Sequence, residues 1–290
     1  MKPGDSVFHS INGLRYHVRN WGEPRHPKLF LLHGWMDVSA SFQFLVDELK
    51  RDWHVIAPDW RGFGLTQWNQ GVYWFPDYLA DLDALLNIYS PNQPANLVGH
   101  SLGGSVACLY GGVRPQRAKC IISLEGFGVP RTDPAETPTQ FAKWLDEVTN
   151  PPQFKPYASF DEVAERLQKN NPRLTIDKTA FLARHWAKQD DAGKIVLVSD
   201  PKHKIINAVR YRLEEALACW QAVTAPVLWV YGSDSWIRDW LKDSLEQFAE
   251  RKQAFKHFSE STIADAGHML HHDQPARVAK AIEDFLKTAP

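Results

Sequence analysis

The sequence predicts an α/β protein: a mostly parallel, doubly wound sheet with an inserted helical segment. Short apolar segments alternate with segments of helical spacing in the first and last parts of the chain, whereas mainly helical patterns occupy about residues 130–222. Because alternating strands and helices form parallel sheets covered on both faces, we expect residues 1–129 and 223–290 to form the core. Residues 130–222 are then a helical lid (cap) over the carboxyl ends of the strands, where open α/β sheets bind ligands.

Most predicted strands are short and largely apolar, which is typical of strands covered on both faces. In chain order they span residues 14–21, 28–32, 53–57, 95–98, 119–124, 226–231 and 254–258. The predicted helices have apolar residues at helical spacing or a recognisable start, such as a proline in the first turn or the capping-box pattern of Ser159 and Glu162. They span about residues 39–50, 76–89, 105–110, 137–148, 159–170, 177–188, 208–223, 236–250 and 274–286.

Composition narrows the class of protein. The formal net charge of -1 gives no basic surface for nucleic acid or for an acidic membrane. The 3 cysteines are scattered without metal-type spacing, which argues against a disulfide framework. The N-terminus lacks the apolar core of a signal peptide, and no apolar run approaches the roughly 20 residues of a membrane helix. We therefore expect a cytoplasmic protein with no nucleic-acid partner and no membrane span; the sequence indicates no oligomeric state.

A candidate nucleophile lies in the segment Gly-His-Ser-Leu-Gly-Gly at residues 99–104, between a predicted strand and a predicted helix. A Gly-x-Ser-x-Gly turn at such a junction holds its central residue in a strained conformation and exposes its side chain. Gly99 and Gly103 lack Cβ atoms, which lets the strand and the helix approach closely. Ser101 is therefore predicted to carry an exposed, reactive hydroxyl.

A serine nucleophile needs a base, and the base is oriented by an acid. The candidate base is His268, because it follows the last predicted strand and precedes the last helix, where a loop can bring it over Ser101. His271 and His272 are immediate rivals, but we expect them to begin a solvent-facing approach to the terminal helix.

Two carboxylates compete for the role of the acid. Glu125 ends the strand that follows the nucleophile's helix, and Asp234 follows the next strand, so each lies at a carboxyl end where it can orient an imidazole. Each also has a purely structural interpretation. Glu125 can be a buried carboxylate that caps the first turn of the lid, and Asp234 can be the N-cap of the next helix.

The oxyanion of a tetrahedral intermediate needs two backbone N–H donors. One is expected from Leu102, which follows the nucleophile. The other is expected from Trp35, which follows His33 and Gly34 at the end of a predicted strand. Gly34 permits the close turn that this oxyanion hole requires.

Together these motifs resemble those of the α/β-hydrolase superfamily over nearly the whole chain. The segments that carry the resemblance are His33-Gly34-Trp35, Asp59-x-Arg61-Gly62-x-Gly64, the nucleophile turn and Gly267-His268. More narrowly, His-Gly-Trp-Met-Asp at residues 33–37 with Ser41-Phe42, and Leu124-Glu125-Gly126, are similar to the serine hydrolase-like subgroup.

The resemblance also ranks the two acids. Many members of the superfamily place the acid three residues after the glycine that ends the later strand; here that position is Ser235, and Asp234 is one residue short. An acid at the position of Glu125 is similar to some haloalkane dehalogenases, so Glu125 is the favoured acid and Asp234 the alternative. Dehalogenases and epoxide hydrolases of this fold use Asp as the nucleophile, and Ser101 argues against both activities.

The resemblance implies a carboxylesterase-like serine hydrolase that cleaves a carboxylic ester, lactone or thioester through an acyl-enzyme at Ser101, with no metal and no organic cofactor. Aromatic residues of the predicted lid favour a small-molecule acyl substrate with an apolar portion, although we expect half or more of them to form the lid's own core. They are Phe141, Trp144, Phe181, Trp186 and Trp220. The alternatives are an acyltransferase that uses the same site and a non-catalytic ligand-binding protein of this fold.

Overall fold

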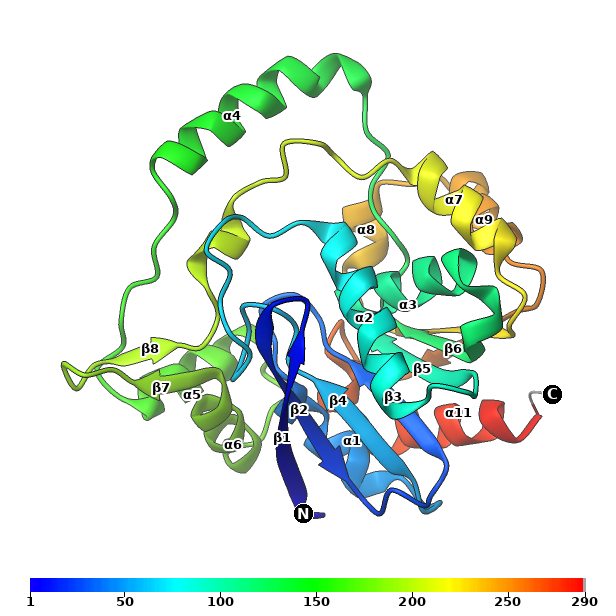
Figure 1. Cartoon of the computed structure of the whole chain (residues 1–290), viewed down its shortest axis with the longest axis horizontal. Helices are drawn as coiled ribbons and strands as arrows, with labels where there is room; N and C mark the ends of the chain where they lie inside the picture. Colours follow the sequence, from blue (N-terminus) through cyan, green and yellow to red (C-terminus); the bar gives the residue numbers. More distant parts are fainter. Residues whose placement is uncertain (289–290) are drawn as a thin grey trace.

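An eight-stranded sheet lies at the centre of the computed structural model, which describes residues 1–288 (Figure 1). Its strands, in spatial order, are β1 (Gly4–Ile11), β2 (Leu14–Trp21), β4 (His54–Pro58), β3 (Lys28–Leu32), β5 (Ala95–His100), β6 (Ala118–Leu124), β9 (Val227–Gly232) and β10 (Phe258–Ile263). The strands from β4 to β10 run parallel, whereas β1 and β2 form an antiparallel hairpin at one edge. The predicted fold class, a mostly parallel sheet between helices, is confirmed.

Side chains of the parallel strands alternate between two hydrophobic clusters, one on each face of the sheet. In β3, Phe30 and Leu32 join one cluster, and Leu29 and Leu31 join the other. The first face is covered by α2 (Phe75–Tyr89), α3 (Leu102–Val113), α7 (Leu213–Ala222), α8 (Ile237–Leu241) and α9 (Leu245–Gln253). The second is covered by α1 (Gln43–Glu48), which follows η1 (Ser39–Phe42), and by α10 (Leu270–Asp273) and α11 (Pro275–Thr288). Because both faces are covered, the central strands are largely apolar.

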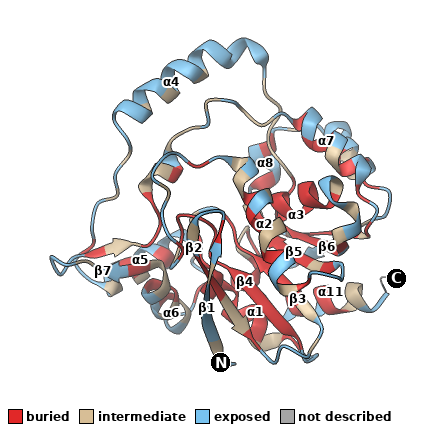
Figure 2. Ribbon diagram, in the orientation of Figure 1, coloured by how far each residue is buried: buried red, intermediate tan, exposed pale blue. Residues whose placement is uncertain are grey.

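A long insertion separates β6 from β9. It contains η3 (Pro134–Glu136), α4 (Thr137–Thr149), α5 (Phe160–Asn170), α6 (Ile176–Trp186), the hairpin of β7 (Ala187–Gln189) and β8 (Ile195–Leu197), η4 (Pro201–Lys204) and α7. Helices α5 and α6 share a small hydrophobic cluster that also includes Phe44 of α1. The last helix, α7, instead packs on α3 within the main core. Figure 2 shows α4 exposed along its length, and none of its residues is buried.

Several elements differ from the sequence-based expectation, which did not include strands β1, β7 and β8. The strand predicted at residues 254–258 is wrong, because Ala254 and Phe255 pack against the core just after α9 and the strand begins only at Phe258. The single helix predicted at residues 236–250 is two helices, α8 and α9. The chain breaks at Lys242, whose φ is 56°, and restarts with a capping box at Ser244.

Among residues 1–288, no helix combines the length and the apolar character needed to cross a membrane.

Candidate active site

Ser101 occupies a strained turn between β5 and α3. Its φ of 50° and ψ of -111° place a residue with a Cβ in a sparsely populated region of backbone space. The turn can be this tight because its glycines lack a Cβ. A Cβ on Gly99 would lie 2.2 Å from the carbonyl carbon of Gly103. The Ser101 amide donates a hydrogen bond to the Leu124 carbonyl at 2.8 Å, which ties the turn to the end of β6.

Glu125 follows β6 directly and directs a fully buried carboxylate toward His268. Its Oε2 lies 3.3 Å from Nδ1 of His268, whose side chain is 14% exposed. Its Oε1 accepts a hydrogen bond of 2.6 Å from the Gly232 amide at the end of β9. The loop that carries His268 is also tied to the nucleophile turn, because Nε2 of His100 lies 2.8 Å from the His268 carbonyl oxygen. These contacts bring the ends of β5, β6 and β9 and the loop after β10 to one place.

The side chain of Asp234, the alternative acid, bonds to the insertion and not to the imidazole. Its side chain is 51% exposed, and its Oδ2 accepts a hydrogen bond of 2.5 Å from Arg173 in the insertion. It does not cap α8 either, since the Ile237 amide donates to the hydroxyl of Ser235. Of the two carboxylates that the sequence left open, Glu125 is the one beside His268.

Ser235 is a site residue that sequence reasoning did not assign. Its hydroxyl donates a hydrogen bond to Oε2 of Glu125, the same oxygen that faces His268. The sequence marked position 235 only as a place where many relatives carry an acid. The signal that could have identified Ser235 is that a hydroxyl replaces the acid at this position while a carboxylate, Glu125, follows another predicted strand.

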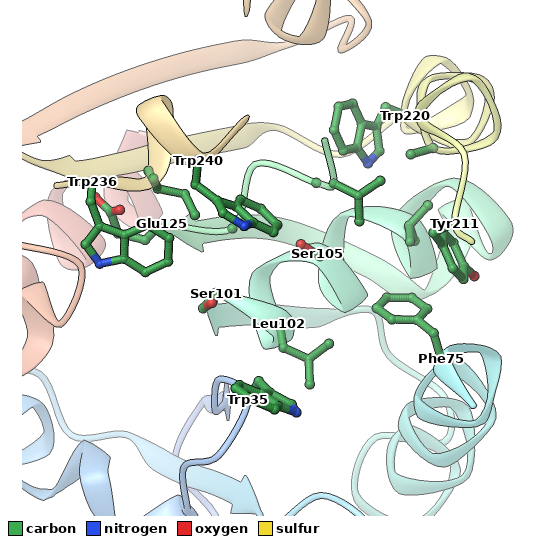
Figure 3. Close-up of a pocket in the computed structure, with 16 residues that line it drawn as sticks. Trp35, Phe75, Ser101, Leu102, Ser105, Glu125, Tyr211, Trp220, Trp236 and Trp240 are labelled. Carbon is green, nitrogen blue, oxygen red and sulfur yellow. The ribbon is translucent and has the colours of Figure 1, made fainter. Parts of the chain in front are cut away.

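Trp35 and Leu102, the predicted oxyanion donors, line one cavity with Ser101 (Figure 3). Leu102 is the first residue of α3, so its N–H has no acceptor within the helix. Gly34 lets the loop before Trp35 approach the nucleophile, because a Cβ at this position would lie 3.3 Å from the Ser101 Cβ and 2.9 Å from the His100 ring.

This catalytic cavity has a volume of about 390 Å³ and a largely apolar wall. Besides Trp35 and Leu102, its bulky lining side chains are Phe75, Leu109, Tyr211, Trp220, Trp236, Ile237 and Trp240. Figure 3 shows Trp236 and Trp240 on one side of Ser101, and Phe75 and Tyr211 further along the wall. Of the five aromatic residues predicted from the insertion, Trp220 lines this cavity and Trp186 lines a second one.

The expectation for His271 and His272 is wrong. Both side chains are buried, with 0% and 2% exposure, because α10 turns inward and packs them against Phe42 and Phe44 of the α1 region. These two histidines belong to the short helix α10, which lies between His268 and α11 and which the sequence did not predict.

A buried polar cluster lies behind the site. Potential ligand atoms of Asp37, His100 and His271 lie within 4.8 Å of one another, and these three side chains are the group among residues 1–288 that could hold a metal ion. Oδ2 of Asp37, Nδ1 of His100 and both ring nitrogens of His271 lack a hydrogen-bond partner. Burial raises the pKa of Asp37 to about 7 and lowers the pKa of both histidines. Unpaired buried groups of this kind are normally bridged by water or an ion.

Comparison with known proteins identifies the fold family. A family model described as alpha/beta hydrolase fold matches residues 27–275. The chain is 25% identical over 281 residues to the serine hydrolase-like protein of Danio rerio, covering 92% of this chain and 83% of that one. It is also 25% identical over 292 residues to the AB hydrolase superfamily protein YfhM of Bacillus subtilis (strain 168), covering 97% of each. Among solved structures, the thioesterase domain from the curacin biosynthetic pathway is similar with a TM-score of 0.85 and 25% identity, covering 97% of this chain and 99% of that one.

Proposed function

The chain belongs to the α/β-hydrolase fold family, and we propose that it is a serine hydrolase that cleaves an ester-type bond through an acyl-enzyme at Ser101. The bond is a carboxylic ester, a lactone or a thioester. The observation that best supports this proposal is the 3.3 Å approach of the buried Glu125 carboxylate to Nδ1 of His268, because Glu125 lines the same cavity as Ser101, whose turn is strained. A buried carboxylate that orients an imidazole is the arrangement that activates a serine hydroxyl.

The proposed reaction has two stages. Ser101 attacks the carbonyl carbon while Nε2 of His268 takes its proton, and Glu125 stabilises the imidazolium that forms. The N–H groups of Trp35 and Leu102 bind the oxyanion, and the proton passes from His268 to the departing alcohol or thiol. Water then attacks the acyl-enzyme with His268 again as the base, which releases the acid and restores Ser101.

We also propose that the insertion from residue 130 to residue 222 acts as a lid. The position of the insertion between β6 and β9, at the carboxyl ends of the strands, supports this, as does the exposure of α4. Since α7 packs on α3, it would stay with the core when the rest of the segment moves. The cytoplasmic location stays a prediction from the sequence.

A fluorophosphonate probe together with a panel of p-nitrophenyl esters tests the proposal. The wild-type protein is expected to label and to hydrolyse the esters, and Ser101→Ala to lose both properties because the nucleophile is removed. Ser105→Ala is the matched control, since Ser105 also lines the cavity, and it is expected to retain labelling. Equal ester turnover by wild type and Ser101→Ala would refute the mechanism, and absence of labelling would favour a ligand-binding protein. Product analysis with an added alcohol or amine separates hydrolysis from acyl transfer.

A further inference from the structure

A second cavity adjoins the catalytic one. Its volume is about 410 Å³, and Trp35 is the residue that lines both cavities. The wall of the second cavity comes mostly from the insertion, including Tyr157, Leu167 and Trp186. The two cavities therefore meet at Trp35 and are similar in size, but they differ in chemistry.

The difference lies in charge. Arg166 and Lys204 line the second cavity, which has no aspartate or glutamate in its wall. Neither cation forms an ion pair with any carboxylate of residues 1–288. Instead, Arg166 donates a hydrogen bond to the Tyr157 hydroxyl, and Nζ of Lys204 lies 4.6 Å from the centre of the Phe154 ring.

Some other cations of the insertion are paired with carboxylates, whereas Arg166 and Lys204 combine the lack of an ion pair with a place in the cavity wall. Arg173 pairs with Asp234, Arg210 with Glu136, and Lys143 with Glu147. An unpaired guanidinium and ammonium beside a cavity without acids form a site that is complementary to an anion. The catalytic cavity, in contrast, is lined by no lysine or arginine.

Resting on the proposed function, we propose that the substrate is an ester or thioester with an apolar acyl part and an anionic leaving part. The acyl part occupies the catalytic cavity, and a carboxylate, sulfonate or phosphate on the leaving part binds Arg166 and Lys204. Both cations are exposed at the rim, so the released anionic alcohol or thiol can pass directly into solvent while the acyl group stays on Ser101. The two cavities thus divide the substrate at Trp35, whose N–H is the proposed oxyanion donor.

A matched pair of substrates tests this division. Both carry the same medium-length acyl chain, one on a neutral phenol and one on a phenol of equal acidity that bears a sulfonate. The wild-type protein is expected to show a KM about tenfold lower for the anionic ester, as is reasonable for two solvent-exposed charge contacts. This preference is expected to shrink when the ionic strength rises from about 0.01 M to about 1 M, because salt screens exposed charges.

The double variant Arg166→Gln/Lys204→Gln is expected to lose the KM preference while its kcat for the neutral ester stays within about twofold of wild type. Lys169→Gln is the matched control, because Lys169 is an exposed cation on the same helix that does not line the cavity, and it is expected to keep the preference. Equal KM values for the two esters in the wild type, or a preference that survives in the double variant, would overturn the proposal.

Calorimetric titration separates this proposal from the proposed function. The sulfonated phenol is titrated into Ser101→Ala protein, which cannot turn over substrate. Binding that weakens about tenfold in the Arg166→Gln/Lys204→Gln background supports the anion site even if wild-type Ser101 fails to label. If the sulfonated phenol does not bind to Ser101→Ala protein while the wild-type protein is labelled at Ser101, the anion site is contradicted and the hydrolase proposal stands.

Discussion

At the scale of single residues, Glu125 holds its carboxylate at the meeting point of three groups. The Gly232 amide donates to one oxygen, and the other oxygen accepts from Ser235 and faces His268. A fully buried carboxylate needs such partners, because an unpaired one is costly to bury. The arrangement leaves little freedom for the side chain, and this rigidity is what an orienting acid requires.

Replacing this acid tests its role. Glu125→Gln is nearly isosteric, but its amide can present a donor to Nδ1 of His268 and so favour the wrong imidazole tautomer. We expect kcat/KM for a p-nitrophenyl ester to fall by about 10³-fold or more, of the order seen when the acid of such a triad becomes an amide. Asp234→Asn is the matched control and is expected to stay within about twofold of wild type, because Asp234 contacts Arg173 instead. Similar losses in both variants would contradict the assignment.

How far these residues could be predicted depends on whether local sequence determines them. Ser101 was predictable because a strand, a tight glycine turn and a helix are all local features. The preference for Glu125 over Asp234 came only from resemblance, since either residue ends a strand. The burial of His271 and His272 was not predictable, because it depends on how α10 packs against Phe42 and Phe44, which are far away in the sequence.

At the scale of elements, α4 and α5 have similar amphipathic sequences but different roles in stability. Helix α5 buries Val163 and Leu167, at 2% and 7% exposure. Helix α4 buries none of its residues, and Leu145 is 57% exposed. Periodicity predicted both helices correctly, but it cannot tell whether an apolar face has a partner, since the partner lies elsewhere in the chain.

Alanine substitutions are expected to separate the two helices. Leu167→Ala removes buried methyl groups and is expected to lower the free energy of unfolding by about 2–4 kcal/mol. Leu145→Ala removes an exposed side chain, and its effect is expected to be below about 0.5 kcal/mol. Urea unfolding followed by circular dichroism measures both. A large loss in Leu145→Ala would mean that α4 packs against something in solution.

Edge strands show the same limit of sequence patterns. The hairpin of β1 and β2 has a recognisable turn at Asn12-Gly13, with φ values of 47° and 80°, but β1 itself is mostly exposed. β10 lies at the opposite edge and is largely polar. Apolar runs reveal strands covered on both faces, so strands at the two edges of the sheet escape that criterion.

At the scale of the whole molecule, buried neutral histidines make stability depend on pH. Burial lowers the pKa of His33 to about 4 and the pKa of His203 and His272 to about 3. His33 illustrates the reason, because its Nε2 accepts the Trp60 amide at 2.8 Å and cannot do so when protonated. In the unfolded chain, these rings bind protons near pH 6.5.

The free energy of unfolding is therefore expected to fall as the pH drops from 7 to 5. Over this range the unfolded state binds protons at these histidines and the native state does not. Each of these histidines therefore lowers the free energy of unfolding by about 2 kcal/mol. Asp37 opposes the trend: its pKa is raised to about 7, so the native state takes up a proton over this range and regains about 2 kcal/mol. Several histidines outweigh one carboxyl group, and urea unfolding followed by tryptophan fluorescence should show a net loss of several kcal/mol.

The variant His203→Gln identifies the source of this dependence. The amide can still donate to the Arg61 carbonyl, as the His203 ring does at 3.1 Å, but it does not titrate. The difference in unfolding free energy between pH 7 and pH 5 should shrink by about 2 kcal/mol, even if the variant is less stable at both values. His257→Asn, at an exposed position, is expected to leave that difference unchanged, because its ring meets solvent in both states. Stability that holds constant or rises toward pH 5 would show that the buried histidines take up protons in the native state.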